Sequence, residues 1–223
     1  MTKNTRRTQR GEPSLTRERI IAASIALLDS SGESGLTFRA LAAHLATGAG
    51  AIYFHIDDKG DLINAACDAI VAATMATAAA GATPQDTLRA IGLGLFDAID
   101  AHPWVGSALA TAPGSMPTVR ILEGIGQQVR AMNVADSALW AATSALLSYI
   151  VGVAGQNAAN ARIGQALGTD RTTFLTDMAE QWAQLDAAAF PFTRSVAGQL
   201  PLHEDRTDFL AGIDLILAGI ASR

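Results

Sequence analysis

Residues 35–63 read GLTFRALAAHLATGAGAIYFHIDDKGDLI, and this stretch decides the fold of the first part of the chain. Thr37 can cap a short helix over residues 38–45, because the apolar positions that follow it have the i, i+3, i+4, i+7 spacing of one helical face. A tight break at residues 46–48 precedes another short helix, at about residues 49–56. Two short helices joined by so tight a turn predict a helix-turn-helix.

The flanking segments complete a small helical domain. Thr16 can cap a preceding helix, and Gly32 is suited to end it. The acidic pair after the second short helix forms the next turn, or caps a long helix that starts near Lys59. We therefore predict a three-helix domain over residues 14–60.

Charge is distributed unevenly along the chain, whose formal net charge is −5. Residues 1–60 hold eight of the sixteen basic residues and six of the 21 acidic ones, and the first nineteen residues alone hold six basic and two acidic residues. A basic N-terminal part in an otherwise acidic chain indicates that this part binds an anion. Residues 1–13 lack apolar periodicity and are predicted to be a basic flexible arm.

The remaining residues, 61–223, predict a larger all-helical body. Apolar residues make up 49% of the chain and aromatic residues 5%, so the core must be mostly Ala, Leu, Ile and Val. Alanine favours helix, and several of the seven prolines stand at apparent helix starts. Helices are expected at about residues 59–80, 85–101, 103–112, 117–132, 135–162, 170–187 and 206–221, with an irregular connection at 188–205.

One uncharged stretch, SALWAATSALLSYIVGVAG at residues 137–155, is nearly long enough to span a membrane. Hydroxyl-bearing side chains recur through it, and no basic cluster flanks it. We therefore expect a buried helix or a helix–helix interface here, and no membrane partner.

Cysteine and motif content narrow the function classes. The single cysteine, Cys67, rules out an intrachain disulfide and a multi-cysteine zinc site, and it fits a reducing cytoplasm. No secretory signal is evident behind the basic N-terminus, so a cytoplasmic location is expected. The four histidines are scattered, and the chain has no HExxH, GxSxG, P-loop or dinucleotide fingerprint. These features disfavour an enzyme.

The stretches GLTFRALAAHL and TGAGAIYFHIDDKGDLI together resemble the DNA-binding domain of the TetR/AcrR family of transcriptional repressors, over about residues 15–63. AFPFTRSVAGQLP followed by TDFLAGIDLILAGI is similar, more weakly, to the C-terminal end of the TetR subgroup. The resemblance implies an all-α fold with a helix-turn-helix domain and a helical ligand-binding and dimerisation domain. It also implies a homodimeric repressor that binds palindromic double-stranded operator DNA and is released by a small-molecule effector.

Several residues at the DNA-binding positions of the resemblance suit contact with DNA. Arg39 can reach a base edge or a phosphate, and arginine paired with guanine is the commonest specific contact. The residues that carry a hydrogen-bond donor for phosphate oxygen are Thr37, Tyr53, His55 and Lys59. Tyr53 and His55 could instead pack in the core, and Lys59 could be a solvated charge. The neighbours expected in the core are Phe38, Leu41, Ile52 and Leu62.

The start of the second short helix carries almost no side chain. Gly48, Ala49 and Gly50 would let this helix lie deep in the major groove, with direct readout limited to methyl contacts. Specificity is then expected to fall on Arg39, on Thr37, on DNA shape and on the basic arm. Entry of the arm into the adjacent minor groove is a hypothesis that rests on Arg6, Arg7 and Arg10.

For residues 61–223 the resemblance implies a dimer interface and a ligand pocket. Two helices from each subunit form a four-helix dimer interface in the family, and the segments at 135–162 and 207–220 have suitable apolar faces, unless those faces are intramolecular core. Close helix approach would be allowed by Gly152, Gly155, Gly212 and Gly219. Residues of the middle helices that could line a ligand pocket, or else pack in the core, are Phe96, Trp104, Met116, Leu122, Ile125, Trp140, Ser144 and Tyr149.

The resemblance to tetracycline repressors, which bind a drug–magnesium chelate, breaks down at two places. The stretch ALATAP at residues 108–113 has alanine where those repressors have a histidine, and Ile125 lies near the position of a drug-contacting glutamine. Both departures argue against tetracycline and against a metal. We expect no cofactor, and an uncharged, mainly apolar effector that selects a body conformation unable to place both recognition helices on DNA.

Two alternatives to control by a small molecule stay open. The first is a DNA-binding regulator controlled by a protein partner, which the size and apolarity of the body cavity would distinguish. The second, less favoured, is an all-helical enzyme. Sharply salt-dependent DNA binding would separate the regulator from the enzyme.

Overall fold

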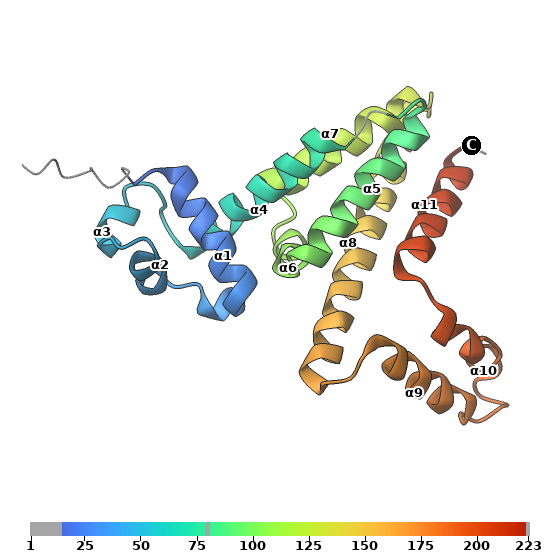
Figure 1. Ribbon diagram of the computed structural model, residues 1–223. Coiled ribbons are helices and arrows are strands. Elements are labelled where there is room, and N and C mark those ends of the chain that lie inside the picture. Colours follow the sequence, from blue (N-terminus) through green and yellow to red (C-terminus); the bar gives the residue numbers. More distant parts are fainter. Residues whose placement is uncertain (1–14, 79–80, 222–223) are drawn as a thin grey trace, which may run out of the picture. The chain divides into compact units, whose positions relative to one another are not determined.

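The computed structural model describes residues 15–78 and 81–221 (Figure 1). All regular elements in these two ranges are helices, so the predicted all-α fold is confirmed. The described residues form two compact units, which divide between residues 66 and 67, inside a helix. The basic arm predicted for residues 1–13 lies outside the described part of the chain.

The N-terminal unit contains α1 (Arg17–Gly35), α2 (Phe38–His44), α3 (Ala49–Ile52) and the first part of α4 (Lys59–Thr77). α2 packs against both α1 and α3. Ala46 takes a positive φ of 51° in the turn between α2 and α3, so the predicted tight break is present. The arrangement is the predicted helix-turn-helix.

Most of the core expected for this unit is confirmed. Leu41, Ile52 and Leu62 are each at most 1% exposed. Truncation of such buried side chains to alanine costs about 2–5 kcal/mol. Phe38 differs from the prediction, because it is only half-buried and stacks on a surface tyrosine.

The ends of α1 show one confirmed and one corrected prediction. Thr16 caps the helix, since its hydroxyl accepts a hydrogen bond from the backbone N–H of Arg19 at 3.3 Å. Gly32 has a φ of 64°, the left-handed conformation expected of a residue that ends a helix. One further turn follows it, to Gly35, and leads into the fully buried Leu36, so α1 continues past its predicted end.

α3 is shorter than predicted, since it ends at Ile52 rather than near residue 56. The backbone N–H of His55 donates to the carbonyl of Ile52 at 2.9 Å, which tightens the chain into a turn. Asp58 then caps α4, because its carboxylate accepts from the backbone N–H of Asp61 at 2.8 Å. The acidic pair therefore supplies a cap, one of its two predicted roles.

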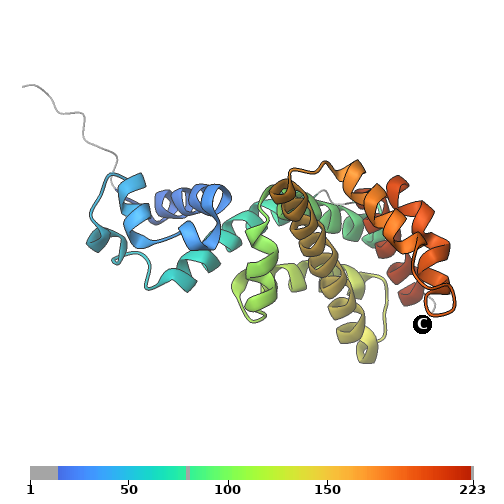
Figure 2. The same cartoon turned by 90° about the horizontal axis from the view of Figure 1, so that it is seen from below.

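The C-terminal unit is built around α8 (Asp136–Leu167), whose 32 residues span about 48 Å. Four helices pack against it: α5 (Pro84–Ala101), α6 (Trp104–Thr111), α7 (Met116–Ala131) and α11 (Asp205–Ala221). Seen from below, α8 runs across this unit (Figure 2). Its long apolar sequence therefore serves as the common surface on which the body assembles.

Two of the glycines expected at a subunit interface instead allow close packing inside one chain. A Cβ on Gly106 of α6 would lie 3.1 Å from the Cα of Gly155 on α8, and Gly212 of α11 lies against the ring of Tyr149. The other two glycines, at which an added Cβ would meet no atom within 4 Å, are Gly152 and Gly219.

The segment after α8 is more regular than predicted. α9 (Arg171–Ala183) packs on α10 (Pro191–Val196) and on a 3₁₀ helix, η1 (Ala197–Leu202). The predicted irregular connection over 188–205 is therefore wrong for most of its length. Pro191 occupies the first turn of α10, where its fixed φ favours a helix start. Neither α9 nor α10 has a fully buried residue.

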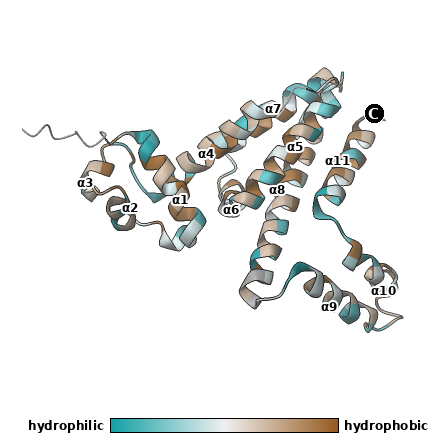
Figure 3. Cartoon of the chain, viewed as in Figure 1, coloured by the Kyte–Doolittle hydropathy of each residue, from teal (hydrophilic) through white to brown (hydrophobic). Residues whose placement is uncertain are grey.

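Residues Asp136–Gly164 are long and apolar enough to cross a membrane by length and composition, with a mean hydropathy of 1.6, and 28% of their most apolar window is buried. Figure 3 shows hydrophobic residues along α5, α8 and α11. α5 and α11 cover one side of α8. The predicted buried helix is thus only partly buried within one chain, and much of its apolar surface stays uncovered.

Candidate functional site

Thr37 combines a helix-capping role with an exposed position. It stands at the N-cap of α2 in extended conformation, and its hydroxyl oxygen accepts from the backbone N–H of Ala40 at 3.1 Å. The hydroxyl proton is not used in this bond, so the side chain can still donate to an incoming acceptor. Arg39, on the first turn of the same helix, is exposed. Both residues therefore present donors on the surface.

An aromatic pair links the two helices of the helix-turn-helix. The rings of Phe38 and Tyr53 stack with centroids 4.3 Å apart and an interplanar angle of 11°. Tyr53 is 54% exposed, so the stack orients it without burying it. Phe54, beside it, is 90% exposed. Sequence reasoning passed over Phe54, although a large apolar residue between two predicted phosphate contacts was the signal that could have found it.

Polar contacts fix the turn between α3 and α4. The Arg17 guanidinium donates to the carbonyl oxygen of His55 at 2.6 Å and forms an ion pair with Asp61 at 3.6 Å. Lys59 donates its ammonium to the carbonyl oxygen of Glu33 at the end of α1. Lys59 is exposed, so the predicted contact with phosphate would have to share or replace this bond.

His55 is half-buried and lies close enough to Glu18 to affect its titration. The pKa of Glu18 is lowered chiefly by a hydrogen bond from its own backbone N–H, then by the hydroxyl of Thr16, with the charge of His55 as a smaller cause. His55 is therefore neither enclosed in the core nor fully exposed, and its burial does not decide between core packing and contact with phosphate.

The small residues at the start of α3 have no packing role inside the unit. A Cβ on Gly48 or Gly50 would meet no atom within 4 Å, and neither glycine has a positive φ. Gly48 stands at the N-cap without a capping side chain. The fold itself therefore does not require glycine at either position.

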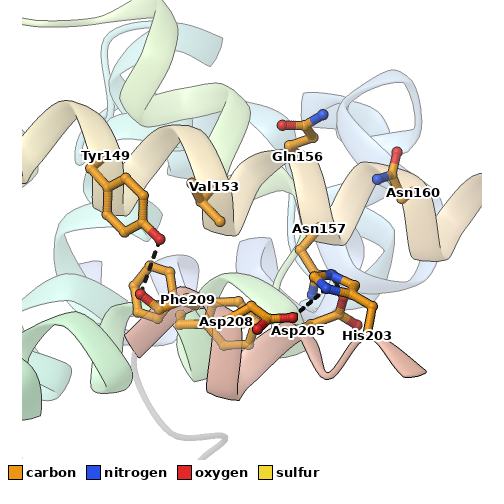
Figure 4. Close-up of a pocket in the computed structure, with 10 residues that line it drawn as sticks. Tyr149, Val153, Gln156, Asn157, Asn160, His203, Asp205, Asp208 and Phe209 are labelled. Carbon is orange, nitrogen blue, oxygen red and sulfur yellow. Dashed lines mark hydrogen bonds and ion pairs between the residues drawn. The ribbon is translucent and has the colours of Figure 1, made fainter. Parts of the chain in front are cut away.

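Two cavities of the C-terminal unit share part of their lining. The larger, of about 730 Å³, lies between α8, α9, η1 and the start of α11. The smaller, of about 290 Å³, lies between α5, α8 and α11 (Figure 4). The residues common to both are Gln156, Asn157, Asn160, His203 and Asp205. The larger volume is that of a pocket for a drug-sized molecule.

A polar network crosses the shared wall of the two cavities, with Asp205 at its centre. Its carboxylate accepts from Arg171 Nε at 2.9 Å and lies 2.9 Å from His203 Nε2. The other imidazole nitrogen of His203 contacts Asp208, as Figure 4 shows. Asn157, with its amide nitrogen turned toward Asp205, donates at 3.2 Å and 3.3 Å to the two carboxylate oxygens.

Two further groups, one in each cavity, have a shifted pKa. The hydrogen bond to Asp205 raises the pKa of Arg171, so this guanidinium stays charged. Burial, and secondarily the charge of Asp208, raises the pKa of Tyr149. The Tyr149 hydroxyl therefore stays protonated, and it donates to the carbonyl oxygen of Phe209 at 3.0 Å.

The structure brings two of the eight predicted ligand residues, Phe96 and Tyr149, to the smaller cavity. Trp104 and Ile125 are buried in the core, and Met116 and Trp140 are 56% and 70% exposed. The remaining two, which are half-buried away from both cavities, are Leu122 and Ser144.

Sequence reasoning missed the apolar wall of the larger cavity, which α9 supplies. Phe174, Leu175, Met178 and Trp182 line it, and all four are half-buried. Their helical spacing in a segment otherwise rich in polar residues was the available signal. The lining of this cavity is mainly apolar by area, with several charged and amide side chains at its polar side. In the described parts of the chain, His, Cys, Asp and Glu form no group of three suited to a metal.

Comparison with known proteins identifies the family. Residues 78–223 match the model of the tetracyclin repressor-like C-terminal domain. The chain belongs to the TetR family. Its N-terminal helix-turn-helix unit and helical body are the two parts expected of a TetR protein.

Two curated relatives are transcriptional regulators. One is an HTH-type transcriptional regulator of Saccharopolyspora erythraea, 28% identical over 64% of this chain and 61% of the relative. The other is the HTH-type transcriptional repressor DrrR1 of Streptomyces coeruleorubidus, 29% identical over 79% of this chain and 64% of the relative. The chain thus spans less than two thirds of the length of either. Both relatives are regulators and not enzymes.

Solved structures agree with the fold. The transcriptional regulator SCO7222, a TetR from Streptomyces coelicolor, is 50% identical, with a TM-score of 0.84 over 94% of this chain and 99% of that one. ActR of the same organism, in complex with (S)-DNPA, is 18% identical with a TM-score of 0.77 over 95% and 99%. BioQ with its natural double-stranded DNA operator is 23% identical with a TM-score of 0.64 over 94% and 100%.

Proposed function

We propose that this TetR protein is a homodimeric transcriptional repressor that binds palindromic operator DNA through α2 and α3 and is released by a small molecule bound in its body. The observation that carries the proposal is the exposed group of Thr37, Arg39 and Tyr53 on a helix-turn-helix. Exposed hydroxyl and guanidinium donors suit a phosphate backbone and the base edges of a major groove.

The roles of these residues follow from their geometry. Tyr53 is held by its stack on Phe38, so its hydroxyl is pre-oriented for a phosphate. Arg39 can contact a base edge, because it is exposed on α2. The unused space around Gly48 and Gly50 would admit the DNA backbone or a base edge close to the main chain. Phe54 adds an exposed ring for apolar contact with the groove wall.

The charge of the N-terminal unit supports a role for the basic arm. Residues 15–66 hold four basic and six acidic residues, so this part of the unit carries no excess of positive charge. Association with DNA depends on neutralisation of phosphates by lysine and arginine. The four basic residues before Glu12 are Lys3, Arg6, Arg7 and Arg10. We propose that they supply much of this attraction.

The uncovered faces of α8 and α11 support a dimer. Trp140 is 70% exposed on α8, and Leu215 is 76% exposed on α11. Between these helices lies an apolar cavity of about 240 Å³, lined by Ala141, Ala145 and Ile216 among others. Large apolar side chains left in water beside small ones are typical of an interface between subunits. Two such helices from each copy would form a four-helix interface.

The test is selection of bound fragments from random DNA, followed by fluorescence anisotropy on the selected sequence at several salt concentrations. We expect a palindrome, one dimer per site, and an affinity that falls steeply as salt rises. Arg39→Ala should weaken binding, and Arg130→Ala, at an exposed arginine of the C-terminal unit, is the matched control. Absence of any selected sequence, or binding by a monomer, would overturn the proposal.

A further inference from the structure

We infer that the two adjoining cavities of the C-terminal unit take a flat aromatic molecule that carries a positive charge. This inference rests on the proposed function, because it names the chemical class of the molecule that would release the protein from DNA. Three observations support it. α9 supplies an aromatic wall, and carboxylates outnumber cationic groups in the lining of the cavities. The guanidinium of the lining is already paired with a carboxylate.

The aromatic wall is only partly covered by the described parts of the chain, because its side chains are half-buried. Phe174 and Trp182 line the larger cavity from α9, and α9 has no fully buried residue. An amphipathic helix normally buries its apolar face in a core, and here that face borders about 730 Å³ of space. A planar ring system would cover these side chains and remove their apolar surface from water, which favours binding.

The charge of the lining is negative. The larger cavity is bordered by three carboxylates, of Asp100, Asp170 and Asp205, and by one guanidinium, of Arg171. The smaller cavity adds the carboxylate of Asp208. Protonation of His203 would add one positive charge and would still leave an excess of carboxylates. The cavities therefore favour a cation over an anion by charge alone.

The single guanidinium is already engaged. Arg171 donates to Asp205 at 2.9 Å and to the carbonyl oxygen of His203 at 2.6 Å. An anionic ligand would have to displace Asp205 and leave that carboxylate with fewer donors. Asp100, in contrast, is exposed at the edge of the cavity and can meet an ammonium group without breaking this network. The rings of Phe174 and Trp182 would add cation–π attraction.

Rhodamine 123, a cation, and fluorescein, an anion, share the same fused ring frame and test the inference directly. We expect the purified protein to bind rhodamine 123 at least about tenfold more tightly than fluorescein, as measured by fluorescence polarisation. Asp100→Asn should weaken rhodamine 123 binding about threefold, since an exposed charge is screened by solvent. Trp182→Leu should weaken it more. Asp177→Asn, on the part of α9 that does not line the cavity, should leave it unchanged.

The outcomes separate this inference from the function on which it rests. Equal binding of both dyes, preference for fluorescein, or no binding of either would overturn the charge and ring class assigned here. Operator binding is measured on the same preparation, with circular dichroism to confirm that each variant is folded. If the dimer binds operator but not rhodamine 123, the repressor proposal stands and only the ligand class is wrong. If the protein binds no operator, the repressor proposal is wrong, independent of the result with the dye.

Discussion

Tyr149 of α8 occupies the space that a side chain at Gly212 of α11 would need. A Cβ on Gly212 would overlap the phenol ring and its oxygen. The same ring stacks on Phe209, with centroids 5.6 Å apart and planes 16° from parallel, and its hydroxyl donates to the Phe209 carbonyl at 3.0 Å. The contact between α8 and α11 therefore depends on a glycine opposite an aromatic residue, beside the smaller cavity.

Gly212→Ala should destabilise the body by about 1–3 kcal/mol, the cost of forcing extra volume into a packed contact. Helix propensity alone would make this substitution favourable by about 1 kcal/mol, so a loss of stability isolates the clash. Chemical denaturation checks it. Gly126→Ala on α7 is the control, because its Cβ would make an ordinary 3.7 Å contact and should be neutral or stabilising. Combination with Tyr149→Ala should relieve the Gly212→Ala clash.

Tyr53→Phe should weaken operator binding by about tenfold or more, because it removes a donor to a charged phosphate while it keeps the ring stack on Phe38. A neutral donor releases no counterion, so the salt dependence of binding should hardly change. Anisotropy over a salt series measures both quantities. An unchanged affinity would mean that Tyr53 serves only to pack against Phe38.

Arg39→Ala should relax the preferred operator sequence, whereas Ala49→Ser should change it little. The reason is that Arg39 can read a base edge, and α3 is short and starts with residues that have almost no side chain. Repeating the selection of bound sequences with each variant measures the two preferences. The assignment is wrong if Ala49→Ser rewrites the preferred site while Arg39→Ala does not.

Deletion of residues 1–12 should lower both the affinity for operator and the salt dependence of that affinity. Each lost contact with phosphate should reduce the slope of log affinity against log salt by about 0.9. Charge reversal without deletion, as Arg6→Glu with Arg7→Glu, should act in the same direction. An intact slope after deletion would show that the arm lies away from the DNA.

Acid should remove part of the stability that the cap of α5 provides. The Thr83 hydroxyl donates to the Asp86 carboxylate at 2.7 Å and, with the smaller effect of Arg89, lowers the pKa of Asp86 below its ordinary value of 3.8. Because the folded state holds the lower pKa, this contribution is present above pH 3.8 and is lost as the pH falls through the folded value. Asp86→Asn should flatten this part of the pH profile of urea unfolding, and Asp177→Asn is the control.

The N-terminal unit could be predicted closely because its signals are local. The caps of Thr16 and Thr37 each act on a backbone N–H three residues later. The core positions follow from spacing within one helix, as at Leu41. Phe38 could not be placed this way, since its half-buried state depends on Tyr53, which lies just after α3.

The candidate cavity could not be predicted, because no single segment contains it. Its walls come from the far half of α8, from α9 and from η1, and the last of these was expected to be irregular. Of the eight residues predicted to line a pocket, Phe96 and Tyr149 reach a cavity, because only these two lie where α5 and α8 meet α11. Size and hydrophobicity alone do not distinguish a residue that fills a core from one that borders a space.

The sequence by itself determined the all-helical fold, the helix-turn-helix and its exposed donors, because caps, periodicity and turn residues act over a few positions. Only the tertiary structure decided where the cavity lies, which glycines pack inside the chain, and that Arg171 is neutralised by Asp205. These features depend on contacts between residues far apart in sequence, whose geometry is set by the packing of whole helices.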